Sequence, residues 1–181
     1  MNLTSAAVNV HLIECLVTKW NVPPSSLAIL TYYTAQLRVY RRTISKLASD
    51  YPQFAFSEVA VHTTDSIKGG SADITFCDSV RTQNTGFTNN PGRNCVALTR
   101  ARSFGIVTAN TQQLNSGGRN APVICKAFDI AHKAKACVNI TKVMDASYSN
   151  LLGHRHVHAV GGAHRSREYG CAKDGMNSFH S

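Results

Sequence analysis

Residues 86–110 read GFTNNPGRNCVALTRARSFGIVTAN. Their pattern predicts a short helix at residues 95–101 after a polar loop at 82–90, and then a strand at 104–109. Arg100 and Arg102 fall where the helix gives way to the strand, so we expect both at the rim of a sheet. The planar guanidinium group matches the oxygens of a phosphate and keeps its charge when it is buried. This stretch therefore predicts an anion site beside a sheet.

The rest of the chain alternates helical and extended patterns around this stretch. Apolar spacing predicts helices at 6–20, from Thr34 onward and at 123–138, and strands at 27–30, 58–63 and 73–77. Such alternation is typical of an α/β fold, with a mostly parallel sheet and helices on both of its faces. Ligands of these sheets bind where the strands end. The turn at 65–70 and the Arg100/Arg102 pair are both expected at or near strand ends.

Length and composition describe one ordinary globular domain. The chain has 181 residues, of which 43% are hydrophobic and 16% are charged. No apolar run approaches the ~18 residues of a membrane helix, and residues 1–10 do not resemble a secretory signal. The six cysteines have no closely spaced pairs, which suits a reducing compartment. We therefore expect an intracellular protein, in the cytoplasm or the nucleus.

The balance of charge favours acidic partners. There are 19 basic and 10 acidic residues, for a formal net charge of +9, and such an excess favours polyanions because phosphate contacts release counterions. Part of the excess lies on one face of the helix that begins at Thr34, at Arg38, Arg41, Arg42 and Lys46. That face is either simply solvated or a contact with nucleic acid.

The chain changes character near its end. Five of the eight histidines follow residue 151, among Gly, Ser and Arg, which predicts a domain at 1–145 and a flexible tail at 146–181. Neutral imidazoles would bind Zn²⁺ or Ni²⁺ adventitiously. A dedicated metal site needs fixed geometry and supporting hydrogen bonds, so none is expected in a glycine-rich tail.

Two further segments carry residues suited to an anion. At 29–36 a strand enters a helix, with Gln36 in the first turn. At 61–70 a strand is followed by hydroxyl groups and an acid, and then by Gly69 and Gly70, whose backbone amides can approach a phosphate closely. Each motif is weak when taken alone, and neither is a Walker A loop.

Taken in order, the segments at 29–36, 59–81 and 86–110 resemble motifs IV, V and VI of superfamily 1 helicases of the up-frameshift type. The family patterns are TPYxxQ, TVDxxQGxExDxVxxSxVR and GFxxDxRRxNVALTRAR. Residues 96–102, VALTRAR, match the last pattern without a gap. The resemblance covers roughly residues 10–110, with a weaker similarity at 123–138.

The resemblance implies a second RecA-like domain, incomplete at its N-terminus. In the family this domain closes on a first RecA-like domain around ATP and Mg²⁺, while single-stranded RNA or DNA lies across both. Arg100 would be the arginine finger that stabilises charge on the transferring phosphoryl group. The positions that would contact the nucleotide are Gln36, Lys68, Gly69, Gly70 and Arg102. The positions near the nucleic-acid strand are Thr63, Thr64 and Arg81.

This sequence departs from the family patterns at several positions. Tyr32 replaces a proline, Lys68 a glutamine, Ser71 a glutamate, Gly92 an arginine and Cys95 an asparagine. The 181 residues contain neither a Walker A loop nor an Asp-Glu pair to hold Mg²⁺, so we expect little or no ATPase activity from this chain alone. Two interpretations stay open: the motor half of a helicase, or a non-catalytic module that binds RNA, DNA or a partner protein.

Overall fold

The computed structural model describes residues 1–67, 69–81, 86–110, 114 and 123–138. Several sequence predictions lie outside these residues. They are the nucleotide contact at Lys68, part of the loop at 82–90, and the tail at 146–181 with its histidines.

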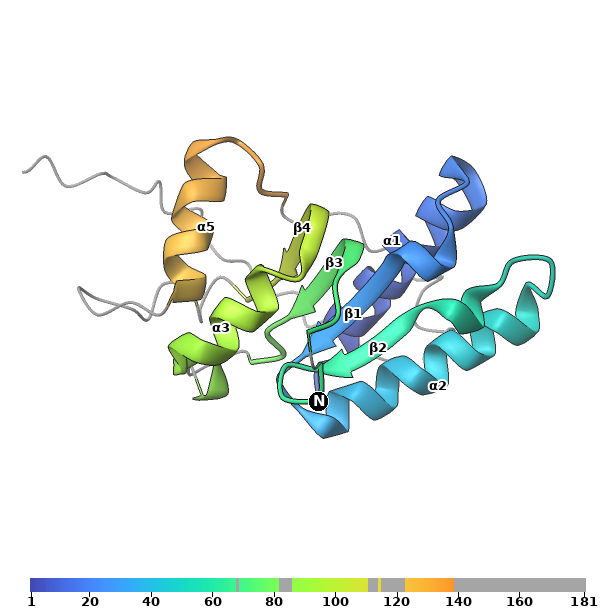
Figure 1. The fold of residues 1–181 in the computed structure, drawn as a ribbon, viewed down its shortest axis with the longest axis horizontal. Coiled ribbons are helices and arrows are strands. Elements are labelled where there is room, and N and C mark those ends of the chain that lie inside the picture. Colours follow the sequence, from blue (N-terminus) through green and yellow to red (C-terminus); the bar gives the residue numbers. More distant parts are fainter. Residues whose placement is uncertain (68, 82–85, 111–113, 115–122, 139–181) are drawn as a thin grey trace, which may run out of the picture.

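Four parallel strands form the sheet, as the alternating pattern predicted. They are β1 (Leu27–Thr31), β2 (Ala60–Thr63), β3 (Ala72–Asp78) and β4 (Ala101–Thr108), and their order across the sheet is β2-β1-β3-β4. All three neighbouring pairs are parallel. The strands therefore all end at one side of the sheet, here called the carboxyl edge, and all begin at the other side, the amino edge (Figure 1).

The main core lies between the sheet and two long helices, α1 (Leu3–Trp20) and α2 (Thr34–Asp50). Ile29, Val61, Phe76 and Ile106 are register partners across the four strands, so they form one apolar row on one face of the sheet. This row packs against side chains of both helices, including Ile13, Tyr40 and Leu47.

The opposite face packs against α3 (Pro91–Leu98), where Ala97 meets Tyr32 and Cys77. The expected covering of both faces by helices is thus confirmed. A last helix, α5 (Val123–Lys133), follows β4 and lies beside α3 (Figure 1). No helix in the described part of the chain is both long enough and apolar enough to cross a bilayer.

Capping explains where the first helix begins and ends. The side chain of Asn2 accepts a hydrogen bond from the Ser5 amide, so it satisfies one of the free donors at the start of α1. The helix ends at Asn21, which has φ of 53°, a left-handed conformation that asparagine tolerates better than most residues.

The junction around Arg100 differs from the sequence prediction. The helix expected at 95–101 is α3, which begins at Pro91 and ends at Leu98, and the strand expected at 104–109 is β4, which begins at Ala101. The side chain of Asn90 accepts from the Arg93 amide, and Pro91 occupies the first turn. This cap and proline start the helix early, although its first residues carry no apolar pattern.

Other boundaries shift by a few residues. Residues 86–89 of the expected loop form a short 3-10 helix. β2 begins at Ala60 rather than at residue 58, because a 3-10 helix occupies Phe56–Glu58. The last helix ends at Lys133 and not at residue 138.

Candidate functional site

The described candidate residues fall into two groups at opposite edges of the sheet. Arg100 and Arg102 lie at the amino edge, where β4 begins, and Gly69 and Gly70 come just before β3 begins there. Thr63 is the last residue of β2, Thr64 follows it, and Arg81 follows the end of β3, so all three lie at the carboxyl edge, as does Gln36 in the first turn of α2. The arginine pair was expected near strand ends; it lies at the start of its strand, opposite the edge where β2 ends.

At the amino edge, the glycine turn and the arginines are joined by hydrogen bonds. The Ala72 amide donates to the Arg100 carbonyl at 3.0 Å. Nη2 of Arg102 donates to the Ser71 carbonyl at 3.1 Å, and Nη1 of Arg102 lies 3.5 Å from Asp73. These bonds join Arg100 and Arg102 to the segment that follows Gly69 and Gly70, whereas Gln36 does not lie there and Lys68 is outside the described residues.

Arg100 has an unsatisfied donor. Its side chain is half-buried, and its Nε is buried with no hydrogen-bond partner among the described residues. Leaving such a donor unpaired costs roughly 1–3 kcal/mol, and such groups are rare in native structures. An acceptor oxygen that approached Arg100 would remove this cost, whereas the exposed guanidinium of Arg102 is already paired with Asp73.

Glycine is needed at residue 69 because of its backbone conformation. Gly69 has φ of +69°, and a Cβ there would meet nothing within 4 Å. A side chain would therefore fit but would strain the left-handed backbone. The turn also leaves open space in front of this backbone.

At the carboxyl edge, β2 ends in a turn closed by two hydroxyl groups. The Thr63 amide donates to Oγ of Ser66 at 2.9 Å, and the Ser66 amide donates to Oγ1 of Thr63 at 3.1 Å. Thr63 is half-buried. Thr64 is buried, and its hydroxyl has no hydrogen-bond partner among the described residues.

A cluster that sequence reasoning missed lies beside this turn. Arg93 holds Asp65 through two hydrogen bonds, from Nε at 2.8 Å and from Nη2 at 3.0 Å, and these bonds hold the pKa of Arg93 above its ordinary value. The guanidinium carbon lies 4.5 Å from the centre of the Phe87 ring, and that ring stacks on Tyr33 at 5.1 Å between centroids. No local pattern indicates these contacts, because the four residues belong to separate segments.

Arg81 belongs to the same region. A Cβ on Gly86 would lie 2.6 Å from the Tyr33 hydroxyl and 3.0 Å from Nε of Arg81. Gly86 therefore allows the chain to pass close to both side chains. This close approach, at φ of +48°, is a physical reason for glycine at this position.

Gln36, although it lies near the carboxyl edge, is inside the protein. Its side chain is fully buried. Oε1 accepts from the Asn2 amide at 2.8 Å, and Nε2 donates to the Asn2 carbonyl at 2.7 Å and to Asp78 at 2.9 Å. The structure does not bring Gln36 to the arginines, and its amide is used to fasten the start of α1 to α2 and β3.

The carboxylate of Asp78 is the centre of this buried polar cluster. Oδ2 accepts from Ser5 at 2.9 Å and from the Tyr40 hydroxyl at 2.7 Å, and Oδ1 accepts from the Val80 amide at 2.9 Å. Burial raises the pKa of Asp78, although these donors oppose the shift. Burial and the nearby carboxylate raise the pKa of Tyr40. The cluster joins α1, α2 and the end of β3.

No three His, Cys, Asp or Glu side chains within the described ranges gather closely enough to hold a metal ion. The amino edge therefore offers positive charge to a ligand. The half-buried Arg100, with its free donor, lies at this edge, and so does the open glycine turn.

Comparison with known proteins shows which family the chain belongs to. A family described as "AAA domain" matches residues 1–112, which is more than half of the chain. The chain belongs to this family. The matched region includes all four strands and both candidate groups.

The relatives narrow the assignment to helicases. The chain is 36% identical over 110 residues to the "Regulator of nonsense transcripts 1 homolog" of Arabidopsis thaliana, across 59% of this chain and 8% of the relative. It is 30% identical over 115 residues to the "Helicase required for RNAi-mediated heterochromatin assembly 1" of Schizosaccharomyces pombe, across 62% of this chain and 11% of the relative. The chain thus spans about a tenth of these relatives, and it contains a RecA-like domain of the up-frameshift-type superfamily 1 helicases.

Proposed function

We propose that this chain is the C-terminal motor half of an ATP-dependent helicase that acts on RNA or DNA. The observation that supports this most directly is the environment of Arg100. Its buried Nε has no hydrogen-bond partner among the described residues, and its carbonyl accepts from the Ala72 amide, in the segment after the glycine turn. A buried cationic donor next to an open backbone turn suits an anionic phosphate.

In this proposal Arg100 is the arginine finger. ATP and Mg²⁺ would be held mainly by a first RecA-like domain, in the same polypeptide or in a partner. The guanidinium of Arg100 would stabilise charge on the γ-phosphoryl oxygens, an effect worth ~10³–10⁵ in rate in other nucleotide hydrolases. The backbone of Gly69 and Gly70, together with Lys68 and Arg102, would contact the same phosphates. This chain alone would then hydrolyse little or no ATP.

The nucleic-acid strand would lie at the carboxyl edge. The hydroxyl of Thr63 can still donate a hydrogen bond, since its oxygen serves as an acceptor within the turn, and Arg81 supplies positive charge nearby. Thr64 is buried, so it would stabilise the carboxyl edge of the sheet and would not contact the nucleic acid directly.

A second candidate function has its own supporting observation. Ser71 occupies the position where the family pattern has a glutamate. It is exposed, and its carbonyl accepts a hydrogen bond from Arg102. Loss of a carboxylate there favours a non-catalytic module that binds nucleic acid or a partner protein without turnover.

One experiment separates the two. The chain is mixed with the first RecA-like domain of the Arabidopsis relative, and ATP turnover is measured with and without single-stranded RNA. The motor proposal expects stimulated turnover that Arg100→Ala reduces by ~10³ or more, while Lys126→Ala, an exposed cation on α5, leaves it unchanged. Turnover that is absent, or that is equal in the Arg100→Ala variant, would leave only the binding module.

A further inference from the structure

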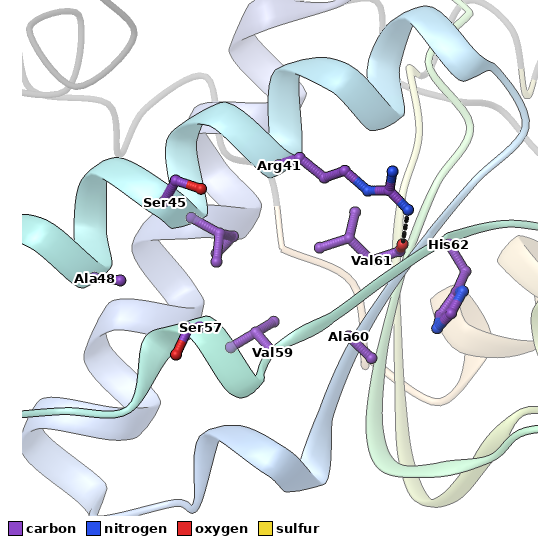
Figure 2. Close-up of a pocket in the computed structure, with 9 residues that line it drawn as sticks. Arg41, Ser45, Ala48, Ser57, Val59, Ala60, Val61 and His62 are labelled. Carbon is purple, nitrogen blue, oxygen red and sulfur yellow. Dashed lines mark hydrogen bonds between the residues drawn. The ribbon is translucent and has the colours of Figure 1, made fainter.

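A shallow groove of about 560 Å³ runs between α2 and the outer edge of β2. Arg41 and Ser45 line it from the helix, and Ser57, Val59 and His62 line it from the strand and the turn before it (Figure 2). Arg41 reaches across the groove to the Val61 carbonyl at 3.4 Å. One donor of this guanidinium is thereby used, and the group has four more N–H donors.

The exposed face of α2 beside the groove is basic, and Arg41 is its one basic residue in the groove lining itself. Arg38, Arg41, Arg42 and Lys46 are all exposed, and Asp50 is the one acidic residue among Thr34–Asp50. Within the part of the chain that the structure describes, no carboxylate forms an ion pair with Arg38, Arg41 or Arg42.

This arrangement costs helix stability. Arg38 and Arg42, and then Arg42 and Lys46, are four residues apart, where like charges destabilise a helix by roughly 0.2–0.5 kcal/mol per pair. No ion pair within the described residues offsets the charges of Arg38, Arg41 and Arg42, and a polyanionic partner would offset them.

The helix and the strand that line the groove both reach the edge proposed for nucleic acid. α2 begins at Thr34 and β2 ends at Thr63, both at the carboxyl edge (Figure 1). A strand bound at Thr63 would therefore meet Arg38 and Arg41 as it continued along β2.

The edge of β2 is poorly suited to a further protein strand. The amide and the carbonyl of Thr63 are occupied by its own turn, and the Val61 carbonyl is occupied by Arg41. A pairing strand would need these groups free. The groove offers donors from Arg41, Ser45, Ser57 and His62, beside the apolar side chains of Ile44, Ala48, Val59, Ala60 and Val61.

We propose that the α2–β2 groove binds the phosphate backbone of single-stranded RNA or DNA, and so extends the strand path beyond the carboxyl edge. Arg41, Ser45 and Ser57 would contact the backbone within the groove, with Arg38 and Arg42 along its rim. This proposal rests on the nucleic-acid binding of the proposed function, but it is independent of Arg100.

The test is the salt dependence of binding to a fluorescent oligouridylate, measured by anisotropy on the full chain. The double variant Arg38→Gln/Arg42→Gln is compared with Lys19→Gln/Lys126→Gln, which removes two exposed charges on α1 and α5. The groove variant is expected to bind about tenfold more weakly at low salt. Its logarithmic salt slope should be shallower by about 1.4, since each lost contact with a single strand contributes ~0.7. The control should keep the wild-type slope.

Three outcomes would overturn the proposal. They are equal slopes for the two double variants, weak and salt-independent binding by the wild type, and competition by polyglutamate as effective as that by unlabelled oligouridylate. The last result would assign the groove to an acidic protein. If the groove variant weakens binding as expected, but the turnover assay shows no ATP hydrolysis that depends on Arg100, only the motor proposal would be overturned.

Discussion

Arg93 and Asp65 form a two-pronged ion pair that joins two segments of the chain at the carboxyl edge. Arg93 lies in the first turn of α3, and Asp65 lies in the turn after β2. At the amino edge the same two segments are joined again, by the bonds from Ala72 to Arg100 and from Arg102 to Ser71. Both segments therefore cross from one edge of the sheet to the other and are fastened at each end.

The Asp65–Arg93 pair is expected to contribute little to global stability. Arg93 is 29% exposed and Asp65 is 59% exposed, so solvent screens the pair. Asp65→Asn and Arg93→Gln should each lower the free energy of unfolding only slightly, and the double variant should cost no more than the larger single change. Urea unfolding measures all three. A large loss of stability in either single variant would show that the pair supports more than its own contact.

Gln36→Ala is expected to destabilise the fold. Both ends of the buried amide are hydrogen-bonded, so its removal leaves the Asn2 amide without its acceptor and takes one of several donors from Asp78, at a cost of roughly 1–3 kcal/mol. The free energy of unfolding in urea checks this. As a control, Gln53→Ala changes an exposed glutamine and should have almost no effect. If both variants were equally stable, the buried cluster would not support α1 as described.

The cluster also predicts a dependence of stability on pH. Burial raises the pKa of Asp78 in the folded protein, so the folded state holds this proton more tightly than the unfolded chain does. The resulting contribution is fully present below the ordinary aspartate pKa of ~3.9 and is lost as pH rises through the folded value. The stability of the wild type relative to Asp78→Asn should therefore fall as pH increases over this window. Parallel urea titrations across the window measure the difference, and a wild type that gained stability relative to the variant would contradict the assigned direction.

Cysteine reactivity should follow burial. Burial raises the pKa of the Cys77 thiol to about 12, so the reactive thiolate is nearly absent at neutral pH. Cys95 and Cys137 are exposed. Brief treatment with iodoacetamide, followed by mass spectrometry, should label Cys95 and Cys137 and leave Cys77 unmodified until denaturant is added. Early labelling of Cys77 would indicate that the face of the sheet beneath α3 opens readily.

The effect of the basic side chains beside the α2–β2 groove on the stability of the fold can be tested without a ligand. Arg38→Gln/Arg42→Gln should unfold at the same temperature as the wild type or slightly higher, because the exposed arginines repel one another along the helix. Thermal unfolding followed by circular dichroism measures this. A marked loss of stability would mean that the arginines support the fold itself.

The regular elements were predictable because their patterns are local. Apolar spacing located both long helices and the strands, and alternation of the two types implied the parallel sheet. The start of α3 was not found, because its signals are the cap at Asn90 and the proline that follows. The burial of Gln36 was equally hidden, since its partners Asn2 and Asp78 are 34 and 42 residues away in the chain. The aromatic and ionic contacts of Phe87 and Arg93 likewise join segments that only the folded sheet brings together.

The connection between α3 and β4 consists of two residues, Thr99 and Arg100. Successive residues of a strand point to opposite faces, so inserting or deleting one residue in this connection would move every following side chain of β4 to the other face. It would also shift Arg100 away from its bond with Ala72. Substitutions around Arg100 are therefore easier to accommodate than changes in length, and the two-residue spacing between α3 and β4 is itself a requirement of this fold.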